Sequence, residues 1–257
     1  MNHQQAAVTE ALRGFFSEHP RLALAFSGGT DSAYLLYAAL VCGIKVRAYY
    51  AQSAFQPAFE RADAMKLAGQ LGADMRVIPL QVLDAPNVRD NPPDRCYHCK
   101  RAIFSALIDA ARADGYDAIM DGTNASDDAG DRPGMRALKE MRVLSPLRDC
   151  GITKAQVREY SRRAGLFTWS KPAYACLATR VPAGTPITAE LLNRVEAAES
   201  ALFELGFADF RCRVFHGAAR LQFSAGQFAE AAARRGEIRR ALSPYFEIIL
   251  LDTEDRG

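Results

Sequence analysis

The 257-residue sequence lacks a long hydrophobic run, an excess of charge of one sign and an apolar N-terminal segment. No stretch approaches the roughly 18 apolar residues that a membrane-spanning helix needs. Residues 1–10 are too polar for a secretory signal peptide. The 32 Lys and Arg residues against 30 Asp and Glu leave a net charge of only +2, which does not favour a nucleic-acid-binding surface. We therefore expect a cytoplasmic protein that has neither a membrane nor a nucleic acid as its partner.

Strand and helix patterns alternate along the first two thirds of the chain. Short apolar or β-branched segments at 21–26, 45–51, 75–80 and 117–121 are separated by helical patterns at 31–41, 57–71 and 99–113. A further helical pattern covers 154–164. This order predicts an α/β fold with a doubly wound parallel sheet over residues 1–180. Residues 187–257 predict a small α+β domain. We expect one helix from a cap at Thr188 to about 205, a second helix over 227–241, and strands at 210–215, 219–223 and 246–251.

The segment Ser27-Gly28-Gly29-Thr30-Asp31-Ser32 lies between the first strand and the first helix. Two glycines let a backbone approach an anion closely, and a helix N-terminus supplies partial positive charge to bind it. Asp31 fits a phosphate site if Mg²⁺ bridges its carboxylate and the phosphate. Otherwise the segment is an ordinary strand-to-helix turn in which Asp31 caps the helix. The segment is neither a GxGxxG nor a Walker A motif. SGGxDS resembles the pyrophosphate-binding loop of the PP-loop ATP pyrophosphatases, which implies that ATP binds here. Asp121 and Gly122 follow another predicted strand and are expected at the same site.

Three of the six cysteines lie in segments that suggest chemistry. Cys96 and Cys99 form a CxxC pair near the start of a helix, which is half of a metal site and needs a partner from elsewhere. Cys176 is the candidate partner, four residues before Arg180. The remaining three, at positions 42, 150 and 212, are expected to be small buried or incidental residues.

Several segments together resemble the LarE family of ATP-dependent sulfur transferases. They are SGGTDS at 27–32, NPPDRCYHCK at 91–100, DGTNASDDAGDRPG at 121–134, SPL at 145–147 and KPAYACLATR at 171–180. The resemblance implies a pyridinium-3,5-dicarboxylate mononucleotide as substrate, activated by ATP through an acyl-adenylate and then converted to a thiocarboxylate. It also implies that Cys176 is the sulfur-bearing residue.

Two sources of sulfur are compatible with this resemblance. With Cys176, the pair Cys96 and Cys99 matches family members that hold a [4Fe-4S] cluster and use a hydrosulfide on its open iron. In the other version Cys176 gives up its own sulfur and becomes dehydroalanine, while Cys96 and Cys99 are structural or bind zinc. A sulfur donor protein or free sulfide would reload the cluster.

The family also implies substrate-binding residues. Arg180 and Glu199 match positions near the substrate. Arg211 and Arg213 alternate on a predicted strand and therefore face one side. They suit the phosphate of the mononucleotide, or they form a solvated face of the strand. The loop Asp131-Arg132-Pro133-Gly134 is expected to fold over the site when ligand binds.

Two other functions remain open at this point. A tRNA thiolation enzyme of the same superfamily would also combine SGGxDS with cysteines, but it needs an RNA-binding surface. A non-catalytic nucleotide or iron–sulfur carrier would bind ATP without releasing pyrophosphate. The small C-terminal domain needs the first domain or another subunit to cover its sheet, and we expect a homo-oligomer.

Overall fold

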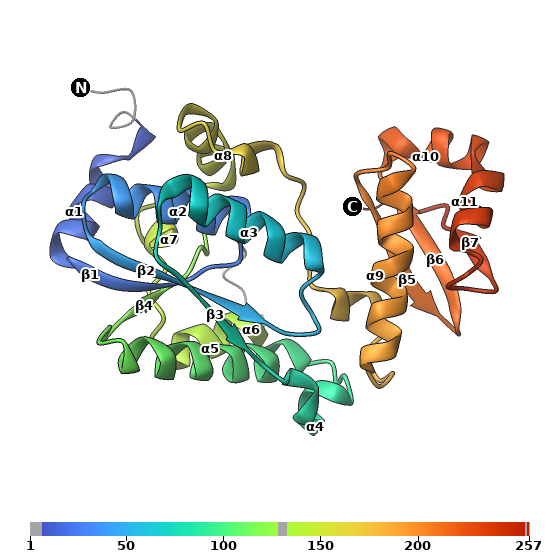
Figure 1. Ribbon diagram of the computed structural model, residues 1–257, viewed down its shortest axis with the longest axis horizontal. Coiled ribbons are helices and arrows are strands. Elements are labelled where there is room, and N and C mark those ends of the chain that lie inside the picture. The colour runs from blue at the N-terminus through green and yellow to red at the C-terminus, as the bar shows by residue number, and fades with distance from the viewer. Residues whose placement is uncertain (1–6, 128–132, 255, 257) are drawn as a thin grey trace. The chain divides into compact units, whose positions relative to one another are not determined.

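The chain forms two compact units in its computed structural model, which describes residues 7–127, 133–254 and 256. The first unit comprises Met1–Val82 and Asp94–Ala173, and the second comprises Leu83–Pro93 and Tyr174–Gly257 (Figure 1). Cys176 and Arg180 therefore belong to the second unit, together with residues 83–93. None of the helices in the described ranges is both long enough and apolar enough to cross a membrane.

The first unit alternates strands and helices as the sequence predicts. Its elements are α1 (Glu10–Glu18), β1 (Arg21–Ala25), α2 (Thr30–Val41), β2 (Lys45–Gln52), α3 (Ala58–Leu71), β3 (Met75–Pro79), α5 (Arg95–Ala113), β4 (Ile119–Met120), α6 (Pro133–Glu140), α7 (Pro146–Asp149), α8 (Lys154–Arg163) and η3 (Phe167–Ser170). The short 3-10 turn η2 (Val82–Asp84) leads out of this unit. Helix α5 begins four residues earlier than predicted, so both Cys96 and Cys99 lie inside it.

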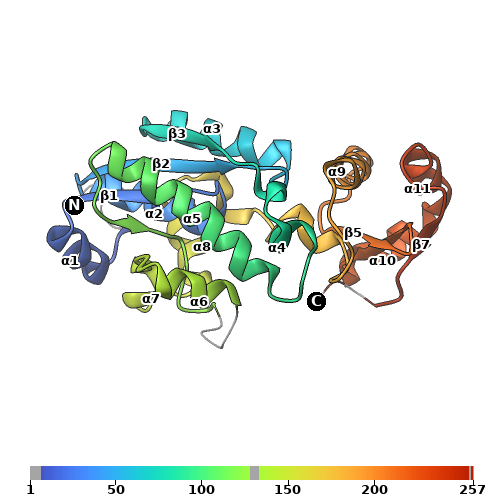
Figure 2. The same ribbon diagram turned by 90° about the horizontal axis from the view of Figure 1, so that it is seen from below.

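The four strands of the first unit form one parallel sheet in the order β3-β2-β1-β4. Successive residues of a strand point to opposite faces. Leu22 and Leu24 of β1 accordingly pack with α2, α3 and α8, whereas Ala23 packs with α5. Figure 2 shows helices on both sides of the sheet. Apolar residues on both faces of short strands thus produce the predicted α/β architecture, because a parallel sheet must be covered twice.

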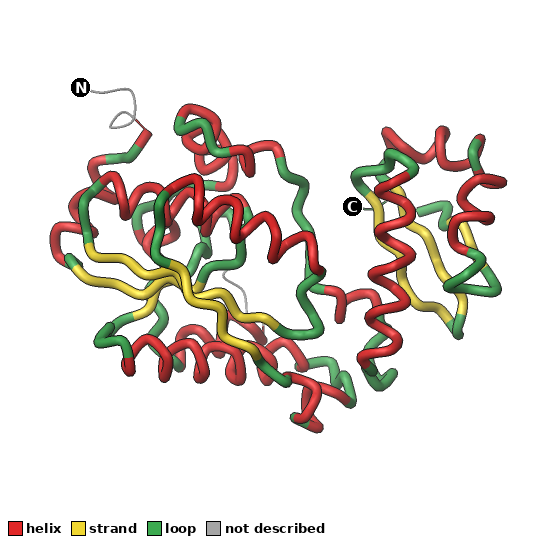
Figure 3. Tube along the Cα trace, viewed as in Figure 1, coloured by secondary structure: helices red, strands yellow, loops and turns green. Residues whose placement is uncertain are grey.

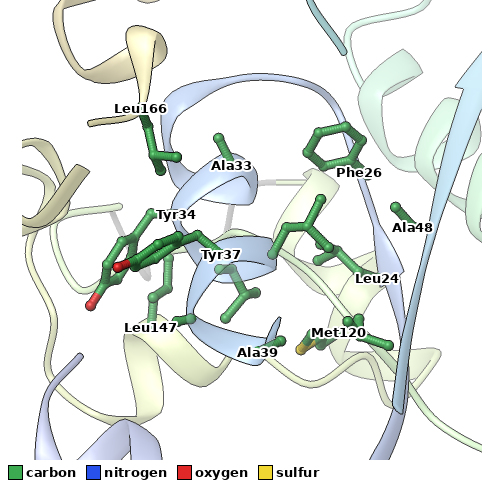
Figure 4. Close-up of a cluster of buried hydrophobic side chains, with 14 of the residues drawn as sticks. Leu24, Phe26, Ala33, Tyr34, Tyr37, Ala39, Ala48, Met120, Leu147 and Leu166 are labelled. Atoms are coloured by element: carbon green, nitrogen blue, oxygen red, sulfur yellow. The ribbon is translucent and has the colours of Figure 1, made fainter. Parts of the chain in front are cut away.

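The larger core of this unit lies between the sheet and α2. Figure 4 shows Leu24 and Phe26 facing Ala33, with Leu147 and Leu166 packing from the later helical segments. Such side chains contribute about 1.5–3 kcal/mol each when fully buried. This packing fixes the start of α2, and with it the SGGTDS loop, against the end of β1.

The second unit is a small α+β structure (Figure 3). Its elements are α4 (Pro86–Arg89), η4 (Leu177–Arg180), α9 (Ala189–Glu204), β5 (Phe210–Phe215), β6 (Ala218–Phe223), α10 (Ala225–Ala233), α11 (Arg235–Leu242) and β7 (Ile249–Leu251). The sheet order is β5-β6-β7, with β5 antiparallel and β7 parallel to β6. Asn91 joins residues 83–93 to this unit, because its amide donates to the carbonyl oxygens of Val181, Pro182 and Thr185.

The prediction of one helix over 227–241 is wrong. The helix is interrupted at Arg234, which has φ −92° and ψ 17° and lies between the end of α10 and the start of α11. The guanidinium of Arg234 lies over the Phe207 ring, 5.0 Å from its centroid, and pairs with Glu230 and Glu237. The break lets α10 pack on β6 while α11 packs on α9. Gly236, a weak helix former, is the second residue of α11.

Candidate functional site

A pocket of about 650 Å³ opens in the first unit at the carboxyl ends of β1 and β4. The chain leaves β1 toward β2 on one side of the sheet, whereas β4 lies on the other side of β1. Ligands of open α/β sheets bind at such a reversal of strand order. Five of the seven residues predicted to bind nucleotide line this pocket: Ser27, Asp31, Ser32, Asp121 and Gly122.

The SGGTDS loop is a tight turn that only glycine can make at its second position. Gly28 has φ +73°, and a Cβ there would lie 2.8 Å from the Cβ of Ala64. The hydroxyls of Ser27 and Ser32 are 3.1 Å apart, and the Ser27 N–H donates to Ser32 Oγ at 3.3 Å. Gly29 is the N-cap of α2. The loop therefore places the N-terminus of this helix at the pocket, where backbone N–H groups suit an anion.

The turn after β4 lies directly against this loop. A Cβ on Gly122 would be 2.8 Å from the backbone nitrogen of Ser32, so a glycine is needed for the two segments to approach. The Asp121 carboxylate accepts hydrogen bonds from the backbone and hydroxyl of Thr123 and from Ser145 Oγ at 3.2, 2.6 and 2.8 Å. Asp121 therefore fixes the shape of the turn while it lines the pocket.

Asp31 has two partners that the sequence analysis missed. Lys154 Nζ lies 2.5 Å from Asp31 Oδ2, and the Asn124 amide donates to Oδ1 at 3.3 Å. Lys154 is the first residue of α8. A cation in the first turn of a helix opposes the helix dipole, and this unfavourable placement is the signal that could have identified Lys154. A carboxylate can bind Mg²⁺ and an ammonium group can bind a phosphate oxygen, so this pair of side chains suits a phosphate ligand with its Mg²⁺.

Cys96 and Cys99 lie on one side of the first turn of α5, since residues three apart on a helix are neighbours. Cys96 is exposed and lines the pocket, whereas Cys99 is 8% exposed. The guanidinium of the buried Arg95 donates to Cys96 Sγ at 3.9 Å. Lys100 follows one turn later at the same pocket. Within the described ranges, no group of three or more His, Cys, Asp or Glu side chains is placed to hold a metal ion.

The remaining predicted residues gather in the second unit. Cys176 is the N-cap of η4, and Arg180 at its end is buried against Glu199. Arg211 and Arg213 both face this segment: Arg211 lies over the Tyr174 ring, 5.6 Å from its centroid, and Arg213 donates to Thr179 O at 2.9 Å.

The two arginines of β5 are held in an environment that disfavours their charge. Burial, reinforced by the neighbouring Arg180, lowers the pKa of Arg211 to about 10. The same two causes lower the pKa of Arg213. A bound anion would offset both effects. In contrast, burial raises the pKa of the Cys212 thiol, which keeps this cysteine neutral, as expected of a small core residue.

The loop predicted to fold over the site is described only in part. Asp131 and Arg132 lie outside the described residues. Pro133 and Gly134 line the pocket of the first unit, and the position of a Cβ on Gly134 would be 3.3 Å from Lys100 Cε.

Comparison with known proteins decides the family. The chain is 33% identical over 235 residues to the pyridinium-3,5-bisthiocarboxylic acid mononucleotide synthase of Lactiplantibacillus plantarum, covering 90% of this chain and 85% of that protein. The chain belongs to the LarE family of ATP-dependent sulfur transferases. An uncharacterised protein of Synechocystis is 37% identical over 222 residues, which cover 86% of this chain and 83% of that protein. No protein-family model matches the chain.

More distant LarE relatives include enzymes that act on RNA. The tRNA-specific 2-thiouridylase MnmA of Thermotoga petrophila is 26% identical over 144 residues, covering 47% of this chain and 40% of that protein. These matches confirm the predicted α/β fold class and the PP-loop superfamily. The match to the bisthiocarboxylic acid mononucleotide synthase confirms the family predicted from the sequence motifs.

Proposed function

We propose that this LarE-family protein converts pyridinium-3,5-dicarboxylate mononucleotide to its thiocarboxylate through an acyl-adenylate. A substrate carboxylate oxygen attacks the α-phosphorus of ATP, and pyrophosphate leaves. Hydrosulfide or a thiolate then attacks the activated carbonyl carbon, and AMP leaves with its electron pair. The observation that carries the proposal is the glycine loop at the strand-order reversal, in a chain that is 33% identical to the named synthase over 90% of its length.

We assign ATP to the pocket of the first unit. The N–H groups at the start of α2 face the pyrophosphate in this arrangement, as expected for an anion at a helix N-terminus. Asp31 would bind Mg²⁺ once Lys154 leaves it, and Lys154 would then contact a phosphate oxygen. The apolar wall formed by Phe26, Tyr49 and Phe104 offers a surface for the adenine ring.

The chemistry of the donor set fits a [4Fe-4S] cluster in part. Cys96 and Cys99 offer two thiols one helical turn apart beside the cation Arg95, and the third proposed ligand, Cys176, belongs to the second unit. Such a cluster would leave one iron without a protein ligand and could supply a bound hydrosulfide. Free sulfide or a sulfur donor protein would replenish it.

In the alternative sulfur step, Cys176 itself acts as the nucleophile. Its thiolate would attack the acyl-adenylate to form a thioester and release AMP. Loss of the Cα proton would then break the Cβ–S bond and leave the thiocarboxylate and dehydroalanine. This route consumes one protein molecule for each sulfur atom transferred.

We assign the phosphate of the pyridinium mononucleotide to Arg211 and Arg213. The lowered pKa of Arg211 and Arg213 indicates that both side chains gain from a nearby anion. A guanidinium group can bind two phosphate oxygens at once, whereas a lysine offers only a point charge. Two arginines therefore suit the phosphate of a mononucleotide. The homo-oligomer and the absence of a nucleic-acid partner stay predictions.

The function is tested with anaerobically purified protein, ATP, Mg²⁺ and the dicarboxylate mononucleotide. Release of pyrophosphate that depends on the nucleotide, together with a product of thiocarboxylate mass, is the expected result. About four irons per chain and an unchanged protein mass would identify the cluster route. A protein mass lower by about 34 Da, the mass of H₂S, would identify the sacrificial route. ATP binding without pyrophosphate release would contradict the proposal, and pyrophosphate release stimulated by tRNA instead would favour RNA thiolation.

A further inference from the structure

Glu199 is a buried carboxylate with every acceptor position in use. It lies on α9, and the residue is only 1% exposed. Its Oε1 accepts from Arg180 Nε at 2.8 Å and from the Cys212 N–H at 3.0 Å. Its Oε2 accepts from Arg180 Nη2 at 3.1 Å and from the Tyr174 hydroxyl. A carboxylate has about four acceptor sites, so these four donors leave no oxygen lone pair for a substrate.

The charge of Glu199 also argues against contact with the substrate. The proposed substrate carries two carboxylates and a phosphate against one pyridinium cation, so its net charge is negative, and like charges at short range repel. The carboxylate is instead balanced by Arg180, which is itself 1% exposed. Burial lowers the pKa of Arg180, but the hydrogen bonds and charge of Glu199 more than offset it, so that the net pKa is raised. Glu199 and Arg180 therefore form a buried ion pair, with 2.8 Å between Oε1 and Nε.

Arg180 also makes hydrogen bonds that reach both peptide groups beside Cys176. Its Nη1 donates to Ala175 O, the carbonyl just before Cys176, at 2.9 Å. The same nitrogen donates to Thr179 Oγ1 at 2.9 Å, and that hydroxyl donates to Cys176 O at 2.9 Å. The Thr179 N–H also donates to Cys176 O, at 3.0 Å. The carbonyl groups on either side of the cysteine Cα are thus held by one guanidinium, directly and through one hydroxyl.

We propose that Glu199 and Tyr174 are positioning residues that hold Arg180 so that it fixes the backbone on both sides of Cys176. This inference rests on the proposed sulfur-transfer function of Cys176. It reassigns Glu199 from substrate binding to orientation of the cysteine. Tyr174 completes the arrangement, because its hydroxyl donates to Glu199 while its ring lies under the Arg180 guanidinium, with 4.5 Å from the guanidinium carbon to the ring centroid.

Replacing Tyr174 with Phe removes one donor to Glu199 and keeps the ring and the charge balance. Glu199→Gln is the second variant, and Tyr245→Phe is the matched control, a tyrosine of the same unit outside this cluster. Four quantities are measured in the full chain: the melting temperature, the rate of pyrophosphate release, the rate of thiocarboxylate formation, and the rate at which iodoacetamide alkylates Cys176. Tryptic mass spectrometry follows the last of these.

For Tyr174→Phe we expect sulfur transfer to slow about tenfold or more, the scale of losses caused by slight misplacement of a reacting group. Pyrophosphate release and the KM of the mononucleotide should stay at the wild-type values. Alkylation of Cys176 should rise about fivefold, the factor that corresponds to one ordinary hydrogen bond. Glu199→Gln should show the same step-specific loss, larger in size, and Tyr245→Phe should match the wild type.

Two results would overturn the inference. A raised KM for the mononucleotide, with transfer unchanged at saturation, would place Glu199 in substrate binding. Equal losses of pyrophosphate release and transfer that follow the melting temperature would make the cluster merely structural. Failure of the proposed function is separable, because a wild-type protein that releases no pyrophosphate would still give an alkylation rate that the variants change or do not change.

Discussion

Replacing Gly122 with Ala tests how closely the turn after β4 must approach the glycine loop. The new Cβ would lie 2.8 Å from the Ser32 nitrogen and 3.2 Å from the Asp31 carbonyl carbon. Both neighbours are backbone atoms, so no side-chain rotation can relieve the contact. Overpacking of this kind costs about 1–3 kcal/mol. A loss of about 2 kcal/mol lowers the melting temperature by about 4–8 °C in a chain of this size.

The same substitution should impair ATP use more than it impairs folding. Relief of the contact moves the start of α2, and with it Asp31 and Ser32, away from the turn. Because displacement of a binding group by a fraction of an ångström is costly, we expect the KM of ATP to rise about tenfold. The assay is nucleotide-dependent pyrophosphate release over a range of ATP concentrations, alongside thermal unfolding.

Gly14 provides the matched control within the same unit. It lies inside α1, and a Cβ there would meet nothing within 4 Å. Gly14→Ala should therefore stabilise the protein by about 0.5–1 kcal/mol, because alanine favours a helix interior. A Gly122→Ala protein with the melting temperature and KM of the wild type, in an experiment where Gly14→Ala is stabilised, would refute the reasoning.

Three further predictions follow from the geometry. Lys154→Met should change the free energy of unfolding by no more than about 1 kcal/mol, since its ion pair with Asp31 is partly exposed. The same variant should raise the KM of ATP about tenfold. A large loss of stability with an unchanged KM would contradict this prediction. Cys99→Ser should lose iron on anaerobic reconstitution, measured by iron analysis, whereas Cys42→Ser should retain it. Hydrogen bonds from Arg76, Tyr49 and Arg47 lower the pKa of Asp114 to about 2 from 3.8, so the wild type should lose stability as pH falls from about 4 to 2, and Asp114→Asn should lose less in acid unfolding scans.

Local patterns in the sequence determined most of the first unit. The apolar strands and amphipathic helices lie within one to four residues of their predicted bounds, because burial on both faces of a parallel sheet leaves a clear pattern. The SGGTDS segment likewise predicted its own place in the fold, because the full motif, and not its two glycines alone, is typical of the turn after the first strand of a PP-loop protein. The same motif predicted the superfamily, which the relatives confirm.

Tertiary structure alone decided which of these groups meet. Lys154 is 123 positions from Asp31 in sequence, and no local pattern pairs them. The break at Arg234 likewise depends on what α10 and α11 pack against. The role of Glu199 depends on four donor atoms of three residues, Tyr174, Arg180 and Cys212, which come from two separate segments of the chain. The sequence marked this glutamate as important because of its family position, but only its burial and its filled acceptor sites separate positioning from binding. Periodicity reports which face of an element is buried, whereas the partners on that face depend on the packing of the whole unit.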